Sequence, residues 1–109
     1  EALSLSGMAI KAPSKIEQHG NTWRIAGDVL MDNANFILQQ SRALSMGDEF
    51  LVDFSAVHKV DTAALSLMME WQRRAAGSSS RVRFANLPVN LSRLVSLYGL
   101  TDFVPVSSV

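Results

Sequence analysis

Residues 50–85 contain two short apolar runs separated by a helical pattern, and this succession strongly limits the folds open to the chain. The first run spans residues 50–54, and the second alternates with polar neighbours over residues 82–84. Residues 62–76 between them carry apolar side chains at helical spacing: Ala64, Leu65, Leu67, Met68, Trp71 and Ala75. A strand, a helix and a strand predict a βαβ unit whose two strands are parallel and joined by a right-handed crossover.

The segment before this unit predicts a hairpin and a first helix. Residues 15–19 and 22–26 alternate weakly around the turn signal Gly20-Asn21, which indicates two antiparallel strands. Gly27-Asp28 is expected to end the second strand. The helix is predicted to begin at an N-cap, Asp32 or Asn33, and to close at Gly47, with these residues at helical spacing: Phe36, Ile37, Gln40, Ser41 and Leu44.

The segment after the unit predicts a third helix. Pro88 is expected to open it, because a proline at a helix start loses no hydrogen bond. Gly99 suits the left-handed position past its end, with Leu100 folding back on Val95 in a Schellman closure. The apolar stripe consists of Leu91, Leu94, Val95 and Tyr98, and the apolar tail 103–106 is expected to pack on the body. The predicted fold is α/β, a small mixed four-stranded sheet covered by three helices in the order ββαβαβα.

Composition excludes several classes of protein. The 109 residues suit one domain, and the 48% hydrophobic content argues against disorder. The formal net charge is zero and the Lys and Arg residues are scattered, so neither nucleic acid binding nor direct membrane insertion is expected. We expect residues 1–13 to be an N-terminal extension, with Met8 as a candidate native start after vector-derived residues, and residues 14–109 to form the domain. The chain has no cysteine, which excludes disulfides and thiolate metal sites.

Asp61 and Thr62 place a carboxylate and a hydroxyl side by side at the start of the helix in the βαβ unit. Either side chain can cap the helix, Thr62 by accepting the N–H of Leu65 or Asp61 by accepting that of Ala64, for about 1 kcal/mol. One cap suffices, so the other side chain is left available for another role.

The helix that follows has a second face, offset from the Leu65/Met68/Trp71 stripe. This face comprises Thr62, Ser66, Met69, Glu70 and Arg73. A methionine among small and charged residues suits contact with a protein partner, and an ordinary solvated face is the alternative. We assign partner binding to this face together with the adjacent connection: His58, Lys59, Asp61, Thr62, Ser66, Met69, Glu70 and Arg73. Thr62 is also a possible phosphorylation site, because a phosphate there would meet free N–H groups at the helix start, although Asp61 would repel it.

Enzymatic alternatives find less support. A small hydrolase could use a Ser or Thr with His58 as its base, but no nucleophile-elbow motif accompanies them. Asp53 and Asp61 lack the spacing of a metal site or acid–base pair, and Asp53 is expected to accept loop amides at the end of its strand. The glycines form no phosphate-binding loop. No catalytic residue, metal or cofactor is therefore predicted.

Residues 51–65 resemble the signature of the STAS family, named after sulfate transporters and anti-sigma-factor antagonists. Asp53-Phe54-Ser55-Ala56-Val57, two residues, then Val60-Asp61-Thr62-Ala63-Ala64-Leu65 follow its pattern, and the family's hydroxyl falls on Thr62. Ala64 stands where the family usually has glycine, which would alter how closely a partner backbone approaches. The resemblance extends from about Ile16 to Pro105.

The C-terminal part resembles the MlaB-containing subgroup of that family, through residues 85–88 and Leu97-Tyr98-Gly99-Leu100. This resemblance implies a non-enzymatic cytoplasmic subunit, peripheral to the inner membrane, that docks on the ATPase of a phospholipid-transport ABC complex through the Thr62 loop and the helix after it. The complex acts in outer-membrane lipid asymmetry. The alternative is an anti-sigma-factor antagonist that switches partners with an anti-sigma kinase and is phosphorylated on Thr62.

Overall fold

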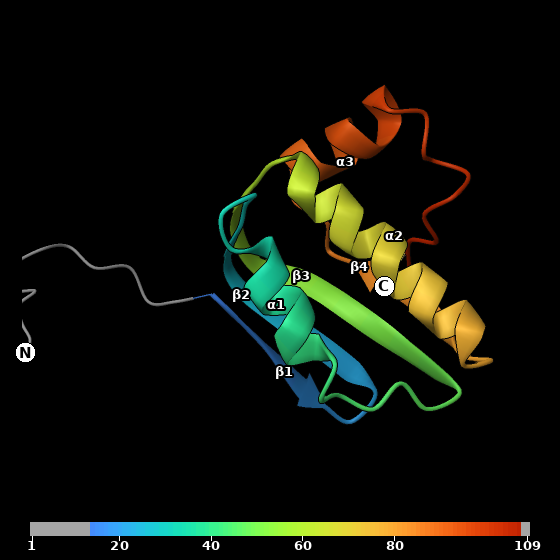
Figure 1. Ribbon diagram of the computed structural model, residues 1–109. Coiled ribbons are helices and arrows are strands. Elements are labelled where there is room, and N and C mark those ends of the chain that lie inside the picture. Colours follow the sequence, from blue (N-terminus) through green and yellow to red (C-terminus); the bar gives the residue numbers. More distant parts are fainter. Residues whose placement is uncertain (1–13, 108–109) are drawn as a thin grey trace, which may run out of the picture.

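The computed structural model describes residues 14–107, and its elements follow the predicted order ββαβαβα (Figure 1). The N-terminal extension predicted for residues 1–13 lies outside the described residues. The elements are β1 (Lys15–His19), β2 (Thr22–Val29), α1 (Ala34–Ser41), β3 (Glu49–Val60), α2 (Thr62–Gly77), β4 (Arg81–Ala85) and α3 (Val89–Leu97).

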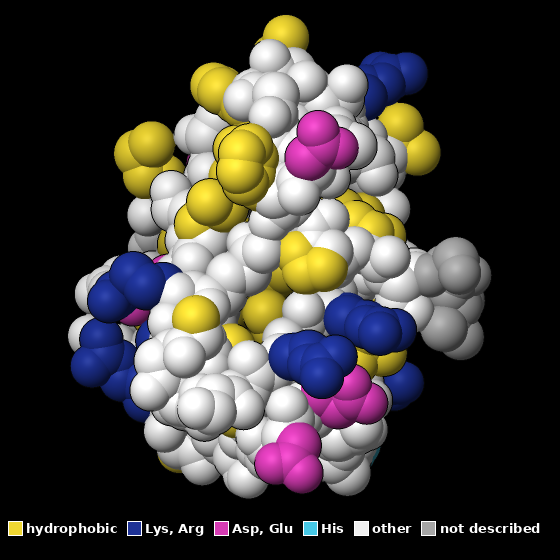
Figure 2. Space-filling view, turned by 90° about the vertical axis from the view of Figure 1, so that its right-hand side faces the viewer, with side chains coloured by type: hydrophobic (Ala, Val, Ile, Leu, Met, Phe, Trp, Pro, Cys, Tyr) yellow, Lys and Arg dark blue, Asp and Glu magenta, His cyan; other side chains and the backbone are white. Residues whose placement is uncertain are grey.

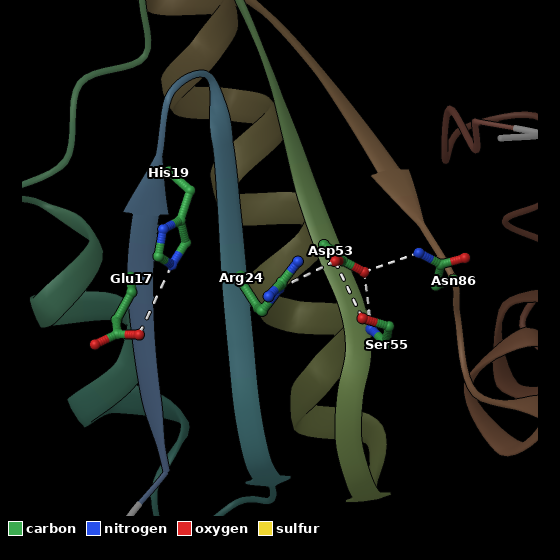
Figure 3. Close-up of polar contacts among 6 residues, drawn as sticks. All are labelled: Glu17, His19, Arg24, Asp53, Ser55 and Asn86. Atoms are coloured by element: carbon green, nitrogen blue, oxygen red, sulfur yellow. Dashed lines mark hydrogen bonds and ion pairs between the residues drawn. The ribbon is translucent and has the colours of Figure 1, made fainter.

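The four strands form one mixed sheet in the order β1-β2-β3-β4. β1 pairs with β2 antiparallel, whereas β2 with β3 and β3 with β4 are parallel, so the predicted hairpin and parallel pair are confirmed. α1 and α2 cover one face of this sheet and α3 packs against α2 (Figure 1). The opposite face carries the polar side chains of the strands, with the helices behind it (Figure 3).

The core between the sheet and the helices is built around two tryptophans. Trp23 and Trp71 are fully buried and meet edge to face, with their ring centroids 6.2 Å apart. Trp23 also stacks on Phe50, with 4.1 Å between the ring centroids. Aromatic pairs in these geometries stabilise a core beyond the area that they bury. The α2 side of the core is the stripe predicted from helical spacing, and all six of its residues are buried.

A buried hydroxyl joins α1 to α2 within this core. Ser41 Oγ accepts hydrogen bonds from Trp71 Nε1 at 2.9 Å and Arg74 Nη1 at 3.0 Å, and donates to Leu38 O at 2.6 Å. Burial, reinforced by nearby Arg42, lowers the pKa of Arg74. One α1 hydroxyl thus accepts a hydrogen bond from each of two α2 side chains, which fixes how the helices lie on each other.

The predicted ends of two elements in the N-terminal half, β2 and α1, are wrong. β2 does not end at Gly27-Asp28 but continues to Val29. Gly27 has a φ of 98°, and a Cβ there would lie 2.7 Å from Ser14 Oγ, so the glycine lets the strand continue where a side chain would clash. α1 ends at Ser41 and not at Gly47, because the N–H groups of residues 42–44 bond three residues back, in turns.

The end of α3 closes as predicted. Gly99 has a φ of 69°, its N–H donates to Ser96 O, and Leu100 N–H donates to Val95 O at 2.9 Å, which is the Schellman pattern. Tyr98 is an exception to the predicted apolar stripe, since its side chain is 56% exposed. In the tail, Val104 is buried and Val106 bridges Phe84 of β4, whereas the Phe103 side chain points to solvent.

Candidate partner-binding surface

β3 is longer than the predicted apolar run of residues 50–54, and it contains two β-bulges. It spans Glu49–Val60, so His58 and Lys59 belong to the strand and not to a connection after it. Relative to β2, β3 carries one extra residue between Asp53 and Ala56 and another between Val57 and Val60. Bulges increase the local twist of a strand and redirect its end, and this strand leads directly into the start of α2.

The first bulge is held by the buried carboxylate of Asp53 (Figure 3). Its Oδ1 accepts from Ser55 N and Asn86 Nδ2, both at 2.9 Å, and its Oδ2 accepts from Ser55 Oγ at 3.1 Å and Arg24 Nε at 3.4 Å. The prediction that Asp53 accepts an amide is confirmed, but that amide lies in a bulge within β3 and not at the strand end. Burial alone would raise the pKa of Asp53, but the hydrogen bonds from Asn86, Ser55 and Arg24 outweigh it and lower the pKa.

The second bulge is held in the same way from β2. Asp28 Oδ1 accepts the backbone N–H of Lys59 at 3.2 Å. In both bulges a carboxylate therefore accepts a backbone N–H from the irregular part of β3.

Asp61, and not Thr62, caps α2. Its Oδ1 accepts the N–H of Ala63 at 2.8 Å, and its Oδ2 accepts the N–H of Met31 at 2.9 Å. The predicted cap by Asp61 is confirmed, although it accepts the N–H of Ala63 and not that of Ala64. The alternative cap by Thr62 is wrong, because α2 begins with Thr62 itself, one residue past the cap. The exposed Thr62 hydroxyl forms no hydrogen bond with another described residue, so it is available to a partner.

A groove runs along α2 from Thr62 and is closed on its other side by the chain after α3. Its volume is about 590 Å³, and it is lined by Thr62, Leu65, Ser66, Met69, Glu70, Arg73, Tyr98 and Leu100. Five of these eight residues come from the set predicted to contact a partner. The twelve residues from Thr62 to Arg73 are separated by eleven helical rises, which correspond to about 16 Å of helix, so the groove is about three turns long.

The groove changes in character along its length. Met69 is 40% exposed and lies between a hydroxyl-bearing start and a charged end. At that end Arg73 Nε donates to Glu70 Oε1 at 3.0 Å, and this hydrogen bond lowers the pKa of Glu70, so the carboxylate is ionised at neutral pH. A partner in the groove would therefore meet the apolar side chain of Met69 in the middle, the hydroxyl of Thr62 at one end and the Glu70–Arg73 ion pair at the other.

Three members of the predicted set do not line the groove, and Asp61, at the cap, is the one next to it. His58 and Lys59 line a separate hollow of about 1260 Å³ with Lys15, Asp28 and Phe36, among others, at the ends of β2 and β3. Among the described residues, no hydrogen bond joins His58 to Thr62, so these two side chains do not form the base–hydroxyl contact that the hydrolase alternative would need from them.

The structure also changes the meaning of two sequence observations. Ala64 is fully buried, so the methyl group that replaces the family's glycine faces the core and not a partner. Tyr98 and Leu100 form one wall of the groove, which helical spacing on α2 alone did not reveal. The Schellman closure at Gly99 was the available signal, because it turns Leu100 back toward the helices.

Within residues 14–107, no helix is long and apolar enough to cross a membrane, and no three His, Cys, Asp or Glu side chains gather as metal ligands. A family model described as Mlab, STAS domain matches residues 14–105. The chain belongs to the MlaB-type STAS family. No curated protein sequence matches it significantly.

The fold is shared with solved STAS structures of low sequence identity. An assigned anti-sigma factor antagonist from Thermotoga maritima superposes with a TM-score of 0.71 at 12% identity, covering 86% of this chain and 85% of that one. An anti-sigma factor antagonist from Mycobacterium paratuberculosis superposes with a TM-score of 0.66 at 18% identity, covering 89% of this chain and 86% of that one. The anti-sigma factor antagonist SpoIIAA in its unphosphorylated form superposes with a TM-score of 0.64 at 15% identity, covering 89% of each chain. At these identities the likeness establishes the fold alone.

Proposed function

We propose that this chain is a non-enzymatic STAS subunit that binds the ATPase of an Mla-type phospholipid-transport ABC transporter and supports its assembly or activity. The observation that carries the proposal is the α2 groove on a member of the MlaB-type family. Such a subunit works in the cytoplasm, held at the inner membrane through its partner, and contributes to outer-membrane lipid asymmetry.

The composition of the groove supports docking of a protein. Tyr, Met and Arg are enriched in protein interfaces, and Tyr98, Met69 and Arg73 supply one of each. An apolar middle can exclude water, while Thr62 and the Glu70–Arg73 pair at the ends can fix the register of a partner through directional contacts.

Co-purification with the ATPase subunit from the same organism tests the proposal. The variant Met69→Arg places a long cation in the groove, and Val89→Arg does the same at an exposed apolar position at the far end of α3. Wild type and Val89→Arg should co-purify with the ATPase and change its activity, whereas Met69→Arg should do neither. Absence of binding and unchanged ATPase activity with wild type would refute the function, and full binding by Met69→Arg would refute the groove as its site.

A second function, an anti-sigma-factor antagonist phosphorylated on Thr62, is favoured by the exposed hydroxyl at the start of α2. Asp61 opposes it, because its carboxylate already occupies the N–H of Ala63 and would repel a phosphate. Incubation with an anti-sigma kinase and ATP, read by mass spectrometry, tests this function. A one-phosphate adduct that Thr62→Val abolishes would support it, and no adduct would count against it.

A further inference from the structure

The carboxylate of Asp61 joins the start of α2 to the loop between β2 and α1. A helix cap needs one acceptor oxygen, and Oδ1 fills that role at Ala63. The second oxygen accepts the N–H of Met31, 30 residues earlier in the chain. Figure 1 shows this loop beside the N-terminal end of α2.

The backbone of the loop is fixed on the other side by Asn33. Its Oδ1 accepts the N–H of Leu30 at 2.8 Å, and its Nδ2 donates to Asp28 O at 2.9 Å. The Met31 side chain is nevertheless 75% exposed. A flexible apolar side chain is therefore presented from a constrained backbone, and a partner that binds it has little loop entropy to remove.

Met31 stands apart from the other exposed apolar side chains near the groove. Others belong to α3 and the segment after it: Val89, Leu97, Tyr98, Phe103 and Val106. Figure 2 shows one face of the molecule, with hydrophobic side chains exposed over its upper part. Single exposed apolar residues are common on protein surfaces. Met31 differs in that its backbone is bonded to the residue immediately before Thr62, which lines the end of the groove.

We propose that the docking surface extends from the groove onto the β2–α1 loop, that Met31 enters an apolar recess of the partner, and that Asp61 is the positioning residue that holds Met31 there. The occupant is the ATPase subunit itself, so the inference rests on the proposed function. Continuity supports this choice: a partner that covers the groove as far as Thr62 next reaches Asp61 and Met31.

Binding of the ATPase subunit to a series of variants, measured by calorimetry, tests the inference. Met31→Ser should weaken binding about tenfold, because burial of part of an apolar side chain is lost, and should leave thermal stability unchanged. Asp61→Asn still caps Ala63, but its single acceptor oxygen cannot also serve Met31. It should therefore weaken binding several-fold and accelerate hydrogen exchange at the Met31 amide. Val89→Ser is the matched control and should bind as wild type does.

The double variant separates positioning from direct contact. If Asp61 acts through Met31, Asp61→Asn combined with Met31→Ser should bind no more weakly than Met31→Ser alone. Additive losses would show that Asp61 contacts the partner itself and would overturn its positioning role. Normal binding by Met31→Ser together with weak binding by Met69→Ser would overturn the inference and leave the proposed function intact. Normal binding by both would refute the docking surface.

Discussion

Replacing Asp53 by Ala removes the carboxylate that holds the first bulge of β3. Four hydrogen bonds are lost, two from Ser55, one from Asn86 and one from Arg24. The Asp53 side chain is buried, but its donors belong to exposed residues. After the substitution these donors can turn to water, so the full cost of buried unpaired groups does not apply.

The expected loss of stability follows from these contacts. Arg24 is more than half exposed and 3.4 Å away, and such a pair contributes less than about 1 kcal/mol. We take about 1 kcal/mol for each of the other three bonds, which is below the usual value of about 1.5–3 kcal/mol for an ionised acceptor because the donors are exposed. Desolvation of the carboxylate offsets part of this sum, which leaves a loss of about 2–3 kcal/mol. Since small domains are stable by about 5–15 kcal/mol, the loss should be large.

Urea unfolding followed by tryptophan fluorescence measures this loss, because Trp23 and Trp71 are both fully buried. Arg24→Ala is the control and should cost less than about 1 kcal/mol. If Asp53→Ala unfolds within about 0.5 kcal/mol of wild type, Asp53 does not hold the bulge. If Arg24→Ala costs as much as Asp53→Ala, the ion pair and not the bulge accounts for the effect.

The pH dependence gives an independent measurement of the same carboxylate. Because its pKa is lower in the folded chain than the unfolded value of about 3.9, ionised Asp53 stabilises the fold fully above that value. This contribution is lost as pH falls through the folded pKa. Asp53→Asn should therefore be less stable than wild type at pH 7, and the difference should shrink as pH falls below about 4. A constant difference would contradict the assignment.

Two further predictions concern the helices. Ser41→Ala should cost about 1–3 kcal/mol in urea unfolding, because it leaves the buried Trp71 N–H without an acceptor, and Ser41→Thr tests whether the hydroxyl alone matters. Asp61→Ala should cost about 1–2 kcal/mol through loss of the cap at Ala63, whereas Thr62→Ala should stay within about 0.5 kcal/mol; equal costs would contradict the assignment of the cap.

The order of the elements could be predicted because each has a local signal. Period-2 and period-3.6 spacing distinguish strands from helices, and the buried stripe of α2 follows from its sequence alone. Gly99 marks the end of α3 because a left-handed residue suits that position. These features depend on neighbours a few residues away in the chain.

The lengths of β2 and β3 could not be predicted because distant residues set them. Asp28 and His58-Lys59 have the polar character of strand ends, yet Asp28 accepts the Lys59 amide 31 residues away and the strands continue. The same limit applies to the groove. Helical spacing gave its α2 wall, but Tyr98 and Leu100 enter it only because α3 packs against α2.

The assignment of the cap to Asp61 links the two proposed functions at one helix end. With Asp61 on the Ala63 N–H, the Thr62 hydroxyl is spared for a partner. A phosphate on Thr62 would have to compete with that carboxylate for the same helix terminus. If it displaced Asp61, the Met31 amide would lose its acceptor as well. Modification would therefore disturb both the groove and the β2–α1 loop, so a phosphorylated chain should lose more affinity for the ATPase than Thr62→Val does.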